Sequence, residues 1–92
     1  MAVEPVAAMV AAMQNPDDDL IALGRLFDEA ALIARAMIEA IPATASLPAE
    51  QAAIEAASGP PAMLAGKIAA MPARTPEGEA VKARAAAWLN GA

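Results

Sequence analysis

Residues 18–41 read DDLIALGRLFDEAALIARAMIEAI, and this stretch decides the fold class of the 92-residue chain. Its apolar residues recur at steps of three and four, a spacing that places them on one face of an α-helix. We expect the longest helix of the chain over 18–41. Its predicted buried face consists of Leu23, Leu26, Phe27, Ala30, Ile33, Met37 and Ile41.

Two large apolar residues of this helix, Ile21 and Leu32, fall within or beside its charged face. They would be exposed on a hairpin of two helices, so we expect something to cover them. Another helix of the same chain is the ordinary explanation, and a partner protein is the alternative. Ile21 and Leu32 are therefore the candidate partner-binding residues.

Proline and glycine divide the rest of the chain into shorter helical segments. We expect helices over 2–14, 48–57, 61–71 and 76–89. The sequence predicts a single all-α domain over residues 1–92, a small bundle built on one long helix with about four shorter ones.

Two of these helix boundaries have a defined local chemistry. Thr75, Pro76 and Glu77 are typical of a helix start, because they supply an N-cap hydroxyl, a first-turn proline and an early acid. Pro60 and Pro61 should break or sharply kink the chain between the two short helices, because proline removes a backbone donor and restricts the residue before it.

The composition indicates a lightly packed domain. Alanine accounts for 29 residues, whereas Leu, Ile, Val and Phe together number 18. Alanine buries little surface, so a core made by this chain alone would be marginal at this size. Residues 1–57 carry a net charge of −7 and residues 58–92 a net charge of +2. Head-to-tail or antiparallel self-association would use this asymmetry, as would folding of the basic end onto the acidic one.

The side-chain inventory argues against most catalytic chemistry. The chain contains no Cys, His or Tyr, which removes thiolate zinc sites, cysteine nucleophiles and the commonest general base. Asp17, Asp18 and Asp19 precede the long helix, where a carboxylate can cap free amides; nothing nearby completes a cation site. We expect no catalytic, cofactor-binding or metal-binding residue and no enzyme activity.

A basic C-terminal segment supports an alternative function. Lys67, Arg74, Lys82, Arg84 and Trp88 resemble the cations and the stacking ring of a nucleic-acid site. The charge is sparse and the net charge of the chain is −5, so binding to nucleic acid is not favoured. The longest stretch without a charged residue spans about twelve residues. A helix that crosses a bilayer needs roughly twenty apolar residues, so no transmembrane helix is expected.

Residues 68–88, IAAMPARTPEGEAVKARAAAW, resemble a sequence motif found in short, alanine-rich proteins of alphaproteobacteria. We know of no activity for those proteins. Those proteins often pair it with an N-terminal helix similar to residues 20–30, LIALGRLFDEA. The segment around Pro60 departs from the long continuous helix that the resemblance implies. The resemblance implies a bacterial, cytoplasmic helical protein and carries over no functional residue.

These patterns predict a non-enzymatic helical module for protein–protein interaction or assembly. The expected partner is a second copy of the chain, as a dimer, or another protein. A nucleic-acid-associated protein and a cofactor- or partner-dependent enzyme subunit stay as alternatives. No cofactor and no membrane partner are expected, and the default location is the cytoplasm because no basic leader precedes the first helix.

Overall fold

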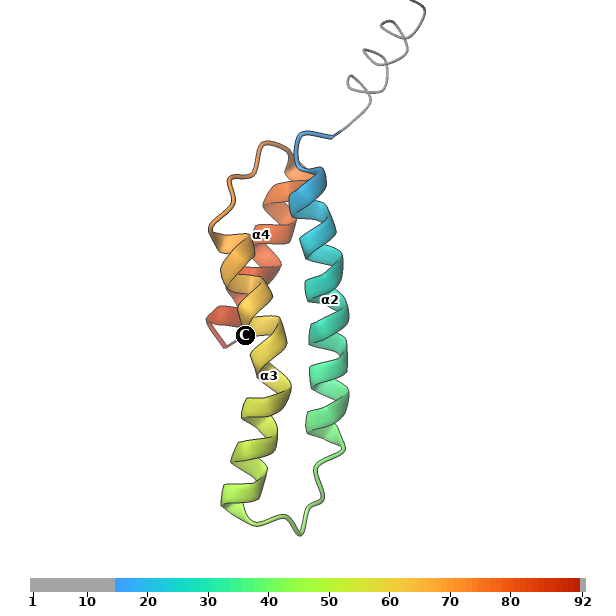
Figure 1. The fold of residues 1–92 in the computed structure, drawn as a ribbon, viewed down its shortest axis with the longest axis vertical. Coiled ribbons are helices and arrows are strands. Elements are labelled where there is room, and N and C mark those ends of the chain that lie inside the picture. Colours follow the sequence, from blue (N-terminus) through green and yellow to red (C-terminus); the bar gives the residue numbers. More distant parts are fainter. Residues whose placement is uncertain (1–14, 92) are drawn as a thin grey trace, which may run out of the picture.

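The computed structural model describes residues 15–91, which form three α-helices and no strand (Figure 1). These helices are α2 (Asp18–Glu39), α3 (Leu47–Ala69) and α4 (Pro76–Leu89). The all-α class is confirmed. The predicted helix count is wrong in this range, because α2 and α3 are both long, at 22 and 23 residues, and only α4 is short. The predicted helix over 2–14 lies outside the described residues.

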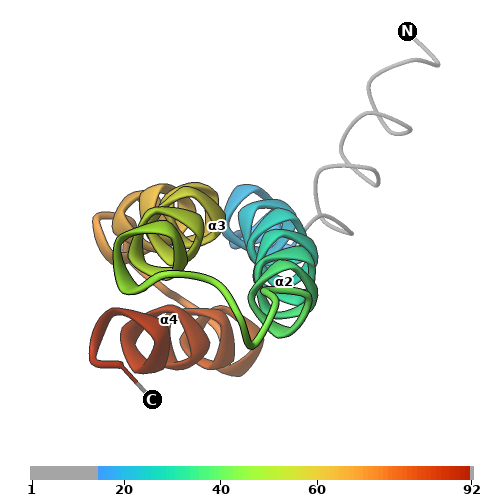
Figure 2. The same cartoon turned by 90° about the horizontal axis from the view of Figure 1, so that it is seen from below.

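The two long helices form an antiparallel hairpin, and α4 packs against both of them (Figures 1 and 2). α4 runs parallel to α2, from the end of the hairpin at which α2 begins. Because α4 has only 14 residues, it lies beside the first part of α2. Near the α2–α3 loop the bundle therefore consists of α2 and α3 alone. Seen end-on, the three helices lie at the corners of a triangle.

Local signals set most of the helix ends. The Thr75 side chain accepts a hydrogen bond from the Gly78 amide at 3.1 Å, so the predicted cap is present and α4 covers the predicted range. Ser46 caps α3 in the same way. α2 ends at Glu39, two residues before the predicted end, because Pro42 disfavours helical backbone at the residue before it.

The predicted separation of helices 48–57 and 61–71 is wrong, because α3 continues through Pro60 and Pro61. An interior proline costs roughly 3 kcal/mol, since it removes a backbone hydrogen bond and its ring crowds the preceding turn. Pro61 is fully buried and Ala57 nearly so, which shows that α3 gains from packing across the proline pair. Tertiary burial therefore outweighs the local preference.

The buried face of α2 only partly matches the predicted one. Phe27 is buried and Leu23 packs against the core, as expected. Leu26, Ile33 and Met37 are about half exposed, whereas Leu20, Gly24, Phe27, Ala31 and Ala34 are buried. Together with Ala65 and Ile68 of α3 and Val81 and Ala85 of α4, Leu20, Phe27 and Ala31 form the hydrophobic core. Small residues on this face let the neighbouring helices approach. An added Cβ at Gly24 would come within 2.9 Å of both Val81 methyl groups.

Candidate functional site

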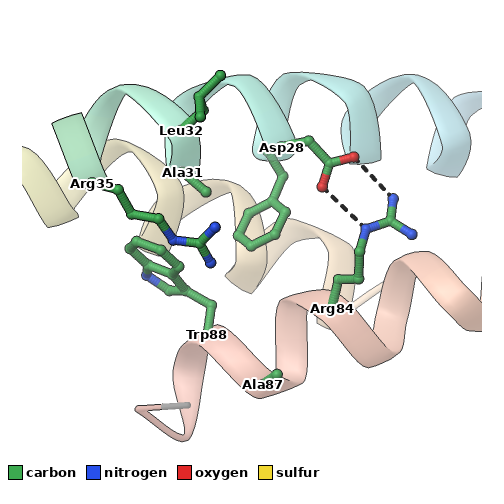
Figure 3. A pocket seen from close by; sticks show the side chains of 8 residues that line it. Asp28, Ala31, Leu32, Arg35, Arg84, Ala87 and Trp88 are labelled. Atoms are coloured by element: carbon green, nitrogen blue, oxygen red, sulfur yellow. Dashed lines mark hydrogen bonds and ion pairs between the residues drawn. The ribbon is translucent and has the colours of Figure 1, made fainter.

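A hollow of about 380 Å³ lies between α2 and α4, and we call it the α2–α4 groove (Figure 3). Phe27, Asp28, Ala31, Leu32 and Arg35 of α2 line it, together with Arg84, Ala87 and Trp88 of α4. Leu32 is 67% exposed, the most exposed large apolar residue of α2. The groove therefore combines a free apolar side chain with charged and aromatic ones.

The aromatic end of the groove is built by Phe27, Trp88 and Arg35. The rings of Phe27 and Trp88 meet edge to face, with centroids 6.0 Å apart and an interplanar angle of 88°. The Arg35 guanidinium carbon lies 5.8 Å from the Trp88 ring centroid, within the range of a cation–π contact. This contact holds a positive charge at the rim of the groove, as Figure 3 shows.

An ion pair joins the two walls. Nε and Nη2 of Arg84 donate to the two carboxylate oxygens of Asp28, each at 3.1 Å. Both side chains are about half exposed, so the pair contributes modestly to stability. Its bidentate geometry nevertheless fixes the position of α4 along α2.

A second hollow, of about 290 Å³, shares Arg84 with the first. Ile21 and Arg25 of α2 line it, as do Glu77, Ala80, Val81 and Arg84 of α4. The structure thus places the two predicted partner-binding residues, Ile21 and Leu32, on the side of α2 that borders α4. Ile21 is half-buried and Leu32 is exposed. That they bind a partner stays a prediction.

The charge of this surface is opposite in sign to that of the chain. Arg25, Arg35 and Arg84 line the two hollows against only two carboxylates, Asp28 and Glu77. The whole chain has a net charge of −5. Sequence reasoning missed this gathering of arginines, because Arg84 lies in α4 and its alignment with α2 depends on tertiary packing.

Asp17, the residue before α2, does not cap that helix as predicted, whereas Asp18 and Asp19 lie in its first turn. The Asp17 side chain makes no cap hydrogen bond to α2 and is buried. Its carboxylate accepts hydrogen bonds from the Arg74 amide, from the Thr75 amide at 2.8 Å and from the Thr75 hydroxyl at 2.6 Å. The Thr75 hydroxyl and the two amides lower the pKa of Asp17 below its ordinary value of 3.8, against the opposing effect of burial. Within residues 15–91, no cluster of acidic side chains has the arrangement of a metal site.

The residues of the nucleic-acid alternative are mostly engaged within the chain. The ammonium of Lys82 donates to the Ala69 carbonyl at 3.1 Å and to the Met71 carbonyl, so it caps the end of α3. Arg84 pairs with Asp28, and Trp88 packs on Phe27. These contacts leave less free basic charge in the C-terminal segment than the sequence suggests.

Neither α2, α3 nor α4 is long and apolar enough to cross a membrane.

Comparison of the chain with family profiles, curated proteins and solved structures finds no match. The resemblance to alphaproteobacterial proteins accordingly stays a prediction.

Proposed function

We propose that this chain is a non-enzymatic protein–protein interaction or assembly module that binds its partner at the α2–α4 groove. The observation that carries the proposal is Leu32, which is 67% exposed beside a hollow walled by arginines and a tryptophan. A second copy of the chain is the first partner to consider.

The chemistry of the groove suits a helix of another chain. Arginine and tryptophan are enriched among the residues that dominate binding energy at protein interfaces. Leu32 and Ile21 offer apolar anchors, and the Asp28–Arg84 pair between them offers polar contacts. An amphipathic helix that lays its apolar side chains into such a groove is a common mode of recognition.

The non-enzymatic assignment rests on which side chains face the groove. Its carboxylate, Asp28, is held by Arg84, and Arg35 lies against Trp88. The sequence supplies no His, Cys or Tyr for proton transfer or nucleophilic attack. A cofactor- or partner-dependent enzyme subunit is the competing proposal, and it would have to work through these charged groups.

A photoreactive amino acid in place of Leu32 tests the proposal. In cells that express the full chain, irradiation should link position 32 to another polypeptide, either a second copy or a different protein. The matched control is the same probe at Ile33, which is 53% exposed on the same helix but points to another side. Equal products from both positions, or none from either, would count against the groove as an interaction site.

A further inference from the structure

We infer that the partner is a second copy of the chain, whose α2 lies antiparallel to the first α2 along the α2–α4 groove. The inference rests on the proposed function and adds to it the identity, direction and register of the partner. Its basis is a stripe of six residues on α2 whose charges become complementary when the helix meets an antiparallel copy of itself.

The stripe consists of Asp18, Ile21, Arg25, Asp28, Leu32 and Arg35. These residues follow one another at alternating steps of three and four, the spacing of the contact positions of two helices that pack along their length. None of the six belongs to the core, and all except the half-buried Ile21 are exposed. The second and fifth positions are apolar, and the other four are charged.

Antiparallel pairing centred between Leu26 and Phe27 matches every position with a complementary one. Asp18 of one copy then faces Arg35 of the other copy, Arg25 faces Asp28, and Ile21 faces Leu32. We call each pair of facing residues a layer, and each layer occurs twice because the dimer is two-fold symmetric. Ile21 and Leu32, the two apolar residues within or beside the charged face of α2, thereby cover each other.

Parallel pairing of the same stripe gives the opposite result. In register, Asp18 would face Asp18, Arg25 would face Arg25 and Arg35 would face Arg35, so each charged layer would carry like charges. Like charges across an interface disfavour that arrangement and so select against it. The pattern therefore specifies the direction of the partner helix as well as its position.

The wall formed by α4 fits this arrangement. Ala80 and Ala87 line the two hollows beside the stripe, and their small side chains let a second helix approach. Arg84 lies between them and already holds Asp28. In the dimer, Arg25 of the second copy joins this pair, so the Asp28 carboxylate is shared by two guanidinium groups.

The first experiment measures mass by light scattering at tens of micromolar. The wild-type chain should give twice its monomer mass of 9.2 kDa. Leu32→Asp should weaken the dimer more than about tenfold, because it places a charge in an apolar layer. Ile33→Asp, a substitution of similar exposure on a neighbouring face, should leave the dimer unchanged. Circular dichroism should confirm that both variants keep their helix content.

The second experiment tests direction and register through charge exchange. Asp18→Arg and Arg35→Asp should each be monomeric, because each homodimer would carry two like-charged layers. An equimolar mixture of the two variants should form a heterodimer, because both end layers then pair an arginine with an aspartate. In a parallel dimer, position 18 would face position 18 and position 35 would face position 35, so the wild type would already carry like charges in both end layers and neither single substitution would weaken it.

A monomeric wild type, or a mixture that does not associate, overturns the inference. If position 32 cross-links to a different protein while the purified chain is a monomer, the inference fails and the proposed function stands. If position 32 cross-links to nothing and the chain is a monomer, both fail.

Discussion

Asp17 shows how a single side chain joins two parts of the molecule that are far apart in sequence. It stands directly before α2, yet its carboxylate binds the backbone and hydroxyl at the start of α4. The Thr75 hydroxyl donates to Asp17 and accepts from the Gly78 amide, so the link and the helix cap share one atom. Asp17 therefore ties the start of α2 to the start of α4.

Replacing Asp17 with Asn should lower the melting temperature at neutral pH, because the amide cannot match a carboxylate that accepts from three donor groups. The lowered pKa of Asp17 means that its contribution is present above pH 3.8 and is lost as the pH falls further. The melting temperatures of wild type and variant should therefore converge as the pH falls below 3.8. Thermal unfolding followed by circular dichroism measures this, with the exposed Asp19→Asn as control. A difference that is independent of pH would contradict the role of the ionised carboxylate.

Gly78 makes room for the same carboxylate. A Cβ at this position would overlap the Asp17 side chain, whereas a Cβ at Gly66 would meet nothing within 4 Å. Gly78→Ala should therefore destabilise the protein by about 1–3 kcal/mol, despite the better helix propensity of alanine. Gly66→Ala should stabilise it by about 0.5–1 kcal/mol. Urea unfolding measures both, and stabilisation by Gly78→Ala would show that the close contact is absent.

At the scale of the helices, the sequence predicted the ends better than the faces. α4 matches its predicted range because Thr75 and Pro76 act on adjacent backbone, which is a local effect. The buried face of α2 was only partly predicted, because alanine on either face reads as apolar and close packing against α3 and α4 selects the face with the smaller side chains. The groove could not be predicted, since it depends on the alignment of Arg84 with Asp28 across two helices.

The continuity of α3 across Pro60 and Pro61 leads to a prediction about that helix. Pro60 is exposed, so Pro60→Ala should restore a helix hydrogen bond without leaving a cavity and should stabilise the protein by up to about 3 kcal/mol. Pro61→Ala should gain less, because it removes a fully buried ring. Helix content should stay the same in both variants, since α3 is already continuous. A rise in far-ultraviolet ellipticity equivalent to a further helical turn would show instead that the prolines break α3.

At the scale of the whole molecule, a thin core coexists with much exposed apolar surface. Of the nine buried hydrophobic residues in the described range, five are alanine. Within residues 15–91, seven larger hydrophobic side chains are at least half exposed: Leu26, Leu32, Ile33, Met37, Leu47, Met63 and Leu89. A domain of this size has a free energy of unfolding near the lower end of about 5–15 kcal/mol, so apolar surface covered by a partner is a large share of its stability.

Stability should consequently depend on protein concentration. If folding and association of two chains are coupled, a tenfold rise in concentration adds roughly 0.7 kcal/mol per chain, which corresponds to about 3–5 °C in melting temperature for a domain of this length. Thermal unfolding at several concentrations from about one to one hundred micromolar measures this, and Leu32→Asp should flatten the dependence. Ile33→Asp should retain the wild-type slope, because Ile33 lies outside the stripe. A wild-type melting temperature that stays constant over this range would mean that the groove is not covered by a second copy, and that the small core of α2, α3 and α4 is stable by itself.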